Sequence, residues 1–130
     1  MGFISQHISS SKSFAALKLW GLALKRMEVS EIGVASTFLT YEDLTRYGAQ
    51  SEDASGIVNL INTVPSAKVA ILFLELPDGK IKASLRTEES IDVSKLARVF
   101  CGGGHKKAAG FTIDGNIVHS KLGWKIEFAD

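Results

Sequence analysis

The segment 68–75 is the feature that most constrains the fold, because it is almost continuously apolar and rich in residues that favour strands. A strand without polar alternation suits a central position in a sheet that is covered on both faces. The Pro-Asp-Gly sequence at 77–79 predicts a tight turn, since proline presets φ and glycine accepts a left-handed conformation. The segment 80–86 then alternates between apolar and polar residues. The two segments therefore predict a hairpin in which one strand is central.

Helical patterns alternate with strand patterns along the rest of the chain. The segment 14–27 predicts an amphipathic helix whose apolar residues wrap most of the way round it. Such a helix either docks against a partner domain or second subunit or belongs to the core of its own domain. Further helices are predicted after the N-cap Thr40, over 53–62, and after Ser90 or Asp92, and further strands over 32–39, 111–118 and 124–128. The pattern predicts an α/β fold, a mixed β-sheet flanked by helices in a single small lobe.

The length of 130 residues suits one domain. We expect residues 1–30 to form an N-terminal amphipathic helix that serves as a linker or docking segment, and residues 31–130 to form the domain. No run of apolar residues approaches the length of a membrane span, and the N-terminus lacks a signal-peptide pattern, so we expect no membrane partner and a cytoplasmic location. Cys101 is the single cysteine of the chain and is expected to be a free thiol.

The formal net charge of +1 argues against a strongly basic surface that coats nucleic acid. The charges are nevertheless unevenly distributed. Acidic residues crowd the N-terminal half, whereas the C-terminal half carries Lys80, Lys82, Arg86, Arg98, Lys106 and Lys107. This asymmetry predicts a local basic site on a nearly neutral protein.

The run from Cys101 to Gly110 carries the clearest functional signal. Three consecutive glycines, Gly102, Gly103 and Gly104, favour a backbone with positive φ or one that a ligand approaches closely. Their amides could form an anion-binding nest, and a short helix beginning at 106–109 would point its amides the same way. The spacing does not fit the Walker phosphate loop, and the run follows a predicted helix, unlike the dinucleotide fingerprint.

Histidine and arginine side chains near this run could contact an anion. His105 could be a general acid or base, a metal ligand or a phosphate donor, and its glycine context favours phosphate donation. His7 and His119 have no companion at ligand spacing, so no metal site is predicted. Arg86 is either a surface residue or a phosphate ligand with the neighbouring Ser84, since a guanidinium suits phosphate well.

Three segments together resemble a known family: Ser84-Leu-Arg86-Thr87, the segment 92–97, and the Gly-Gly-Gly-His and Ala-Ala-Gly motifs within 102–110. They are similar to the DHH-associated domain (type 1), the C-terminal lobe of DHH-family phosphoesterases. The similarity is greatest to the RecJ-like oligoribonucleases and the 3′-phosphoadenosine-5′-phosphate (PAP) phosphatases, and it covers roughly residues 32–113. The resemblance implies an α/β lobe that binds a nucleotide or the end of an oligonucleotide across a cleft from a catalytic lobe.

The resemblance also implies a set of site residues. They would hold substrate phosphate or ribose and comprise Ser84, Arg86, Gly102, Gly103, Gly104, His105, Lys106 and Ala109. Hydrolysis by water and two manganese ions would take place in the DHH catalytic lobe. This chain has no Asp-His-His sequence, so we do not expect it to be catalytic alone. The expected partners are a short oligonucleotide or nucleotide phosphate, that catalytic lobe, and a second copy in a homodimer.

Two other functions stay open at this point. The chain could be a non-catalytic RNA-binding module, because the same lobe type is similar to the tRNA-contacting lobe of alanyl-tRNA synthetases. It could also be an interaction domain in which the glycine run only terminates a helix.

Overall fold

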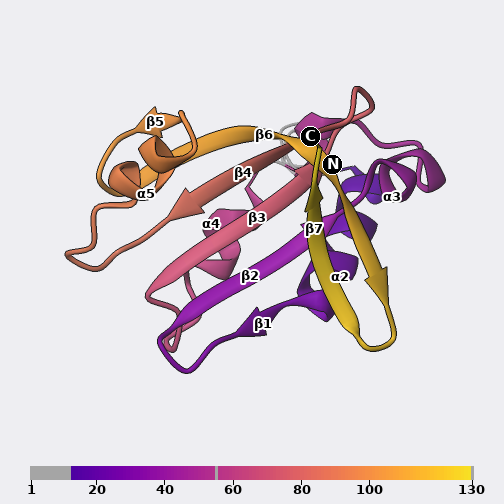
Figure 1. Ribbon diagram of the computed structural model, residues 1–130. Helices are drawn as coiled ribbons and strands as arrows, with labels where there is room; N and C mark the ends of the chain where they lie inside the picture. Colours follow the sequence, from indigo (N-terminus) through magenta and orange to yellow (C-terminus); the bar gives the residue numbers. More distant parts are fainter. Residues whose placement is uncertain (1–12, 55, 130) are drawn as a thin grey trace, which may run out of the picture.

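The computed structural model describes residues 13–54 and 56–129. Its strands are β1 (Glu28–Val29), β2 (Val34–Leu39), β3 (Val69–Glu75), β4 (Lys80–Arg86), β5 (Gly103–Gly104), β6 (Ala108–Ser120) and β7 (Gly123–Phe128). Its helices are α2 (Phe14–Arg26), α3 (Tyr41–Arg46), the 3₁₀ helix η1 (Ser51–Ala54), α4 (Ile57–Ile61) and α5 (Val93–Val99). The strands are ordered β1-β2-β3-β4-β6-β5, with β7 paired to β6 (Figure 1). Among the strand pairs of the described residues, only β2 and β3 run parallel, so the predicted mixed α/β architecture is confirmed.

The strand β3 is central, as its apolar sequence predicts, and both of its faces are covered. One face packs Leu72 and Leu74 against α2, η1 and α4. The opposite face is covered by α5 at one end and by the β6–β7 hairpin at the other. The hairpin reaches that face through β6, a single strand of 13 residues that leaves the main sheet to pair with β7 (Figure 1).

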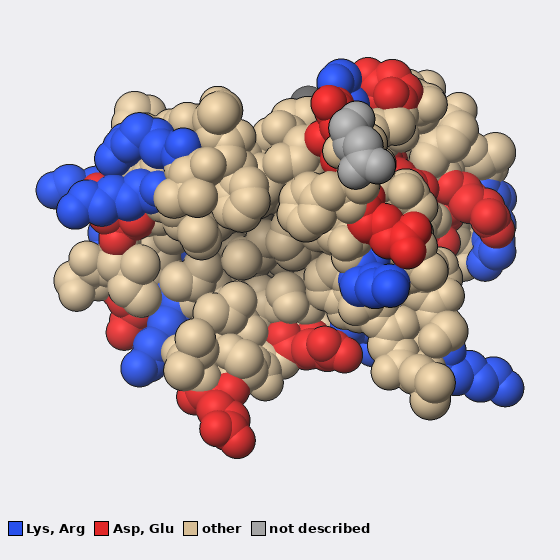
Figure 2. Space-filling model, viewed as in Figure 1, with Lys and Arg blue, Asp and Glu red and all other residues tan. Residues whose placement is uncertain are grey.

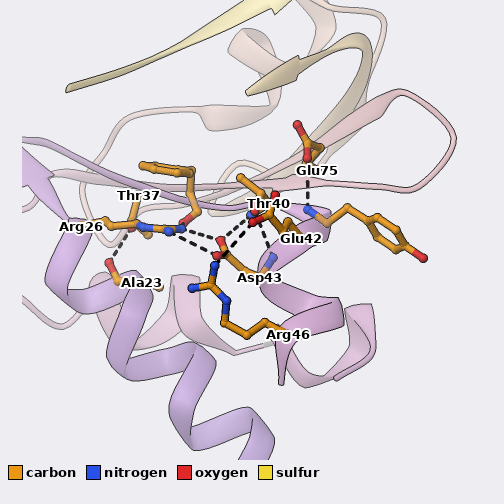
Figure 3. Close-up of polar contacts among 10 residues, drawn as sticks. Ala23, Arg26, Thr37, Thr40, Glu42, Asp43, Arg46 and Glu75 are labelled. Carbon is orange, nitrogen blue, oxygen red and sulfur yellow. Dashed lines mark hydrogen bonds and ion pairs between the residues drawn. The ribbon is translucent and has the colours of Figure 1, made fainter. Parts of the chain in front are cut away.

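The helix α2 belongs to the core of this domain. Leu19 and Ala23 are fully buried against the sheet, and the Thr37 hydroxyl of β2 donates to the Ala23 carbonyl at 2.5 Å (Figure 3). Of the two alternatives for this helix, the structure therefore shows the core one. Phe14 and Leu17 remain exposed on its outer side. Residues 1–12 of the predicted linker segment lie outside the described residues.

A buried ion pair joins the end of α2 to the start of α3. Arg26 donates to both carboxylate oxygens of Asp43, at 2.6 and 3.2 Å (Figure 3). The Arg26 guanidinium also lies 4.4 Å from the centre of the Phe38 ring. Asp43 also accepts from the Thr40 amide, while the Thr40 hydroxyl accepts from the Asp43 amide. This reciprocal capping box confirms Thr40 as the predicted N-cap.

Two local predictions are wrong in detail. The helix predicted over 53–62 is split into η1 and α4, because Gly56 adopts a left-handed φ of 92° between them. The strand predicted over 111–118 is longer at both ends, because the ladder to β4 and β5 begins at Ala108 and the ladder to β7 runs to Ser120. Among the described residues, no helix has the length and apolar character needed to cross a membrane.

Candidate functional site

The glycine run forms a β-hairpin. Gly103 and Gly104 form β5 and pair with Gly110 and Ala109 of β6. The His105 amide donates to the Ala108 carbonyl at 2.8 Å, and the Ala108 amide donates back at 3.2 Å. The short helix considered at 106–109 does not form, since these residues close a turn and start β6.

The same run also terminates α5, with Cys101 rather than a glycine in the left-handed position. Cys101 adopts the left-handed conformation, with φ of 64°. The Gly102 amide donates to the Ala97 carbonyl at 2.8 Å and the Cys101 amide to the Arg98 carbonyl at 3.0 Å, which is the Schellman pattern. Gly102 is needed for close approach instead, because a Cβ there would lie 2.2 Å from the Gly110 carbonyl oxygen.

The predicted nest of successive amides is wrong. The amides of Gly102 and His105 are already bonded within the protein. The His105–Ala108 pair exchanges both hydrogen bonds, so the next pair along the ladder, Gly104–Ala109, is a non-bonded one. The Gly104 amide therefore points away from β6. Of the three glycines, only Gly104 has a left-handed φ, at 139°.

Strand register brings most of the predicted side chains onto one face of the sheet. Arg86 lies opposite Ala108, and Ala108 lies opposite His105, so these three residues share a row across β4, β6 and the hairpin. In the next row, Ser84 lies opposite Gly110, and Gly110 lies opposite Gly103. Residues in register across a sheet point to the same side. Arg86, His105 and Ser84 therefore lie on the same face as Gly103 and Gly110, which carry no side chains.

Arg86 is held in place by two acceptors. Its Nε donates to Oδ1 of Asn59 in α4 at 3.0 Å, and its Nη1 donates to the Leu85 carbonyl at 2.8 Å. Its Nη2 has no partner among the described residues. A pocket of about 220 Å³ lies beside it, lined by polar and apolar residues that include Asn59, Ser84 and Lys82. The free end of the guanidinium is thus available to a ligand on this face.

The other predicted residues are placed differently. The side chain of Ala109 is buried on the opposite face of the sheet, packed with α5. Lys106 is exposed at the tip of the hairpin, whereas Lys107 donates to the Glu88 and Glu89 carbonyls at 2.9 Å each. Lysine and arginine side chains gather at the end of the molecule formed by α5 and β5 (Figure 2). This end is therefore locally basic, as the charge asymmetry predicts.

The pocket lining includes Lys82 and Asn59, which were not predicted as site residues. Lys82 follows the same alternation as Ser84 and Arg86, so the strand pattern alone could have included it. Asn59 lies 27 positions before Arg86, and no local pattern connects the two. Within residues 13–54 and 56–129, no three His, Cys, Asp or Glu side chains are grouped so that they could hold a metal ion.

The chain has sequence relatives among known proteins. The chain matches the DHHA1 domain over residues 32–122. It is 30% identical over 97 residues to the bifunctional oligoribonuclease and PAP phosphatase NrnA of Bacillus subtilis. The alignment covers 75% of this chain and 30% of that protein. It is 26% identical over 93 residues to the probable NrnA of Streptococcus mutans, covering 72% of this chain. The chain spans 30% of the length of each of these relatives.

Two solved structures superpose on most of this chain. An exopolyphosphatase-related protein from Bacteroides fragilis superposes with a TM-score of 0.73 at 29% identity, covering 78% of this chain and 30% of that one. The pGpG-specific phosphodiesterase PggH from Vibrio cholerae shares the fold, with a TM-score of 0.56 at 15% identity. The match covers 77% of this chain and 33% of the PggH chain. The matched region includes both Arg86 and the whole glycine-histidine hairpin. The chain therefore belongs to the DHHA1 domain family, found in DHH-family phosphoesterases.

Proposed function

We propose that this chain is the substrate-binding lobe of a DHH-family phosphoesterase of the oligoribonuclease or PAP phosphatase type. In this proposal the lobe holds the phosphate of a short oligonucleotide or nucleotide, and a separate DHH lobe carries out hydrolysis. The observation that carries the proposal is the shared row of Arg86 and His105 beside the bare glycine positions. The names of the relatives, which describe enzymes acting on oligoribonucleotides and nucleotide phosphates, support the same substrate class.

The arrangement suits an anion for physical reasons. Arg86 offers Nη2 as a charged donor while Asn59 and Leu85 fix the rest of the guanidinium. A pre-oriented donor loses less conformational freedom on binding than a mobile one. His105 adds an imidazole donor and Ser84 a hydroxyl on the same face. Gly103 and Gly110 let a phosphate or ribose approach the backbone without meeting a side chain. When bound in the catalytic lobe, manganese would supply activated water.

We expect Arg86→Ala and His105→Ala each to weaken nucleotide binding by about 1.5–3 kcal/mol, the usual contribution of a hydrogen bond to a charged group. Isothermal titration calorimetry with a dinucleotide and with adenosine 3′,5′-bisphosphate measures this. Lys80→Ala is the matched control, because Lys80 lies on the same strand face but pairs with Asp114 at the far end of β4. Unchanged affinity in both site variants would refute the site.

Titration with tRNA in the same experiment separates the other two functions. Tighter binding of tRNA than of the two small ligands would contradict the phosphoesterase assignment and favour a non-catalytic RNA-binding module. No heat from any of the three ligands would favour an interaction domain in which the hairpin has only a structural role.

Asn59 should act on binding through Arg86. We expect Asn59→Ala to weaken binding about three- to tenfold, since the guanidinium loses an acceptor that fixes its orientation. The same substitution should have little effect in an Arg86→Ala background, because interacting residues are non-additive. Additive losses, or a lower melting temperature without a loss of affinity, would show that Asn59 has no positioning role.

Two further expectations belong to this proposal. A lobe of a nucleotide-processing enzyme is expected in the cytoplasm, and a homodimer is expected as the assembly state. Size-exclusion chromatography with light scattering tests the second, with a mass of about 28 kDa for two copies of a 14.0 kDa chain.

A further inference from the structure

A second hollow lies at the other end of the molecule. It has a volume of about 630 Å³ and separates the end of α2 from the tip of the β6–β7 hairpin. Its lining includes Lys25, Phe38, His119, Lys121 and Trp124. β6 has 13 residues, with Ala108 of the Arg86 site at its start and His119 near its end. Ala108 and His119 are 11 positions apart, so at about 3.3 Å per residue the path along the strand is about 36 Å, and the two sites lie at opposite ends of β6.

One wall of this hollow is aromatic. His119 lies directly opposite Trp124 in the hairpin, and both rings pack on the buried Phe38, at centroid distances of 5.1 and 4.8 Å. His119 is exposed and Trp124 is half-buried, so parts of both rings face the hollow. The exposed parts of the two adjacent rings offer a surface on which a nucleobase can stack.

The lining also carries unpaired positive charge. Lys25 is in the last turn of α2, and Lys121 is in the turn between β6 and β7. Neither ammonium group forms an ion pair or hydrogen bond with a described residue. Arg26 is not available to a ligand in the same way, because its guanidinium pairs with Asp43 and packs on the Phe38 ring. Glu28 is the acidic residue among the described lining residues. The hollow therefore favours an anion beside its aromatic wall.

The aromatic wall and the two lysines together indicate the class of ligand. A purely apolar ligand would leave the two lysines without a role, and a free phosphate would leave the rings without one. A nucleotide combines a flat base with an anionic phosphate, so it can use both features. We propose that this hollow is a second nucleotide-binding site, with the base against His119 and Trp124 and the phosphate between Lys25 and Lys121. This site does not depend on the Arg86 site.

The test is a titration of the full 130-residue chain with adenosine 5′-monophosphate, followed in ¹H–¹⁵N spectra by the indole signal of Trp124. Trp124→Phe assigns that signal. We expect the signal to shift with the nucleotide, and adenosine and inorganic phosphate each to bind at least about fivefold more weakly at this position. Lys25→Glu and Lys121→Glu should each weaken nucleotide binding about fivefold, and added salt should reduce it further. His119→Ala should have a similar effect through lost stacking.

Two control variants separate this site from the first. Lys95→Glu makes the same charge change on α5, away from the hollow, and should leave the Trp124 titration unchanged. Arg86→Ala should also leave it unchanged, even though it weakens binding at the other end of the sheet. The inference is overturned if the Trp124 signal does not move at about 10 mM nucleotide. It is equally overturned if adenosine binds as tightly as its monophosphate, or if both lysine reversals leave the affinity unchanged.

Discussion

Replacing Asp43 with alanine is expected to lower the free energy of unfolding by about 3–5 kcal/mol, because it leaves the Arg26 guanidinium buried without its partner. The side chains of Arg26 and Asp43 are only 16% and 4% exposed. The substitution also removes the carboxylate that accepts from the Thr40 amide, so α3 loses half of its capping box. Urea denaturation followed by circular dichroism measures the loss.

Glu42→Ala is the matched control for this prediction. Glu42 is adjacent in sequence and also pairs with an arginine, but Glu42 and Arg46 are exposed and 3.5 Å apart. An exposed pair of this kind contributes at most about 0.5 kcal/mol. Similar losses for Glu42→Ala and Asp43→Ala would contradict the assignment of the stability to burial.

The contribution of Asp43 should also depend on pH. Burial alone would raise the pKa of its carboxyl group, but the hydrogen bonds and charge from Arg26, with the hydrogen bonds from Thr40, outweigh it and lower the pKa below the usual 3.8. A group with a lowered folded-state pKa stabilises the protein above its unfolded pKa of about 4 and loses that contribution as the pH falls further. The stability difference between the wild type and Asp43→Asn should therefore shrink below about pH 4. A constant difference down to pH 2 would contradict this.

The second large effect is expected at Gly102. A Cβ on this residue would lie 2.2 Å from the Gly110 carbonyl oxygen and 2.6 Å from Cβ of Phe111. The first neighbour is backbone and cannot rotate away, so Gly102→Ala must displace β6 or the end of α5. We expect a loss of about 3 kcal/mol or more in the free energy of unfolding, at the upper end of overpacking effects.

Gly103 provides the matched comparison, since it is adjacent and belongs to the same motif. A Cβ there meets nothing within 4 Å, and its φ is not positive. We expect Gly103→Ala to change stability by less than about 1 kcal/mol. Gly103→Val should weaken nucleotide binding more than it affects folding, because its side chain would cover the bare surface beside Ser84 and Arg86. Equal destabilisation by Gly102→Ala and Gly103→Ala, measured by thermal unfolding, would contradict the assigned contacts.

Local sequence patterns predicted the strands more accurately than the glycine run. The apolar run at 68–75, the turn at 77–79 and the alternation at 80–86 each depend on neighbouring residues, and the strands β3 and β4 match them within one residue. The conformation of the glycine run was harder to predict, because three glycines are compatible with a nest, a helix end or a strand. The run forms a hairpin because β6 supplies the pairing partners for β5.

The sequence by itself determined the family, the central strand and the chemistry of the candidate site. Ser84, Arg86 and His105 are identified by type and motif, and residue type sets what each can donate. Only the tertiary structure decided which of the predicted residues share a surface. Strand register sends Ala109 to the opposite face, while Asn59, 27 positions away from Arg86, becomes its acceptor. The physical reason is that hydrogen-bond register and side-chain contact join residues remote in sequence, and local patterns contain no information about such pairs.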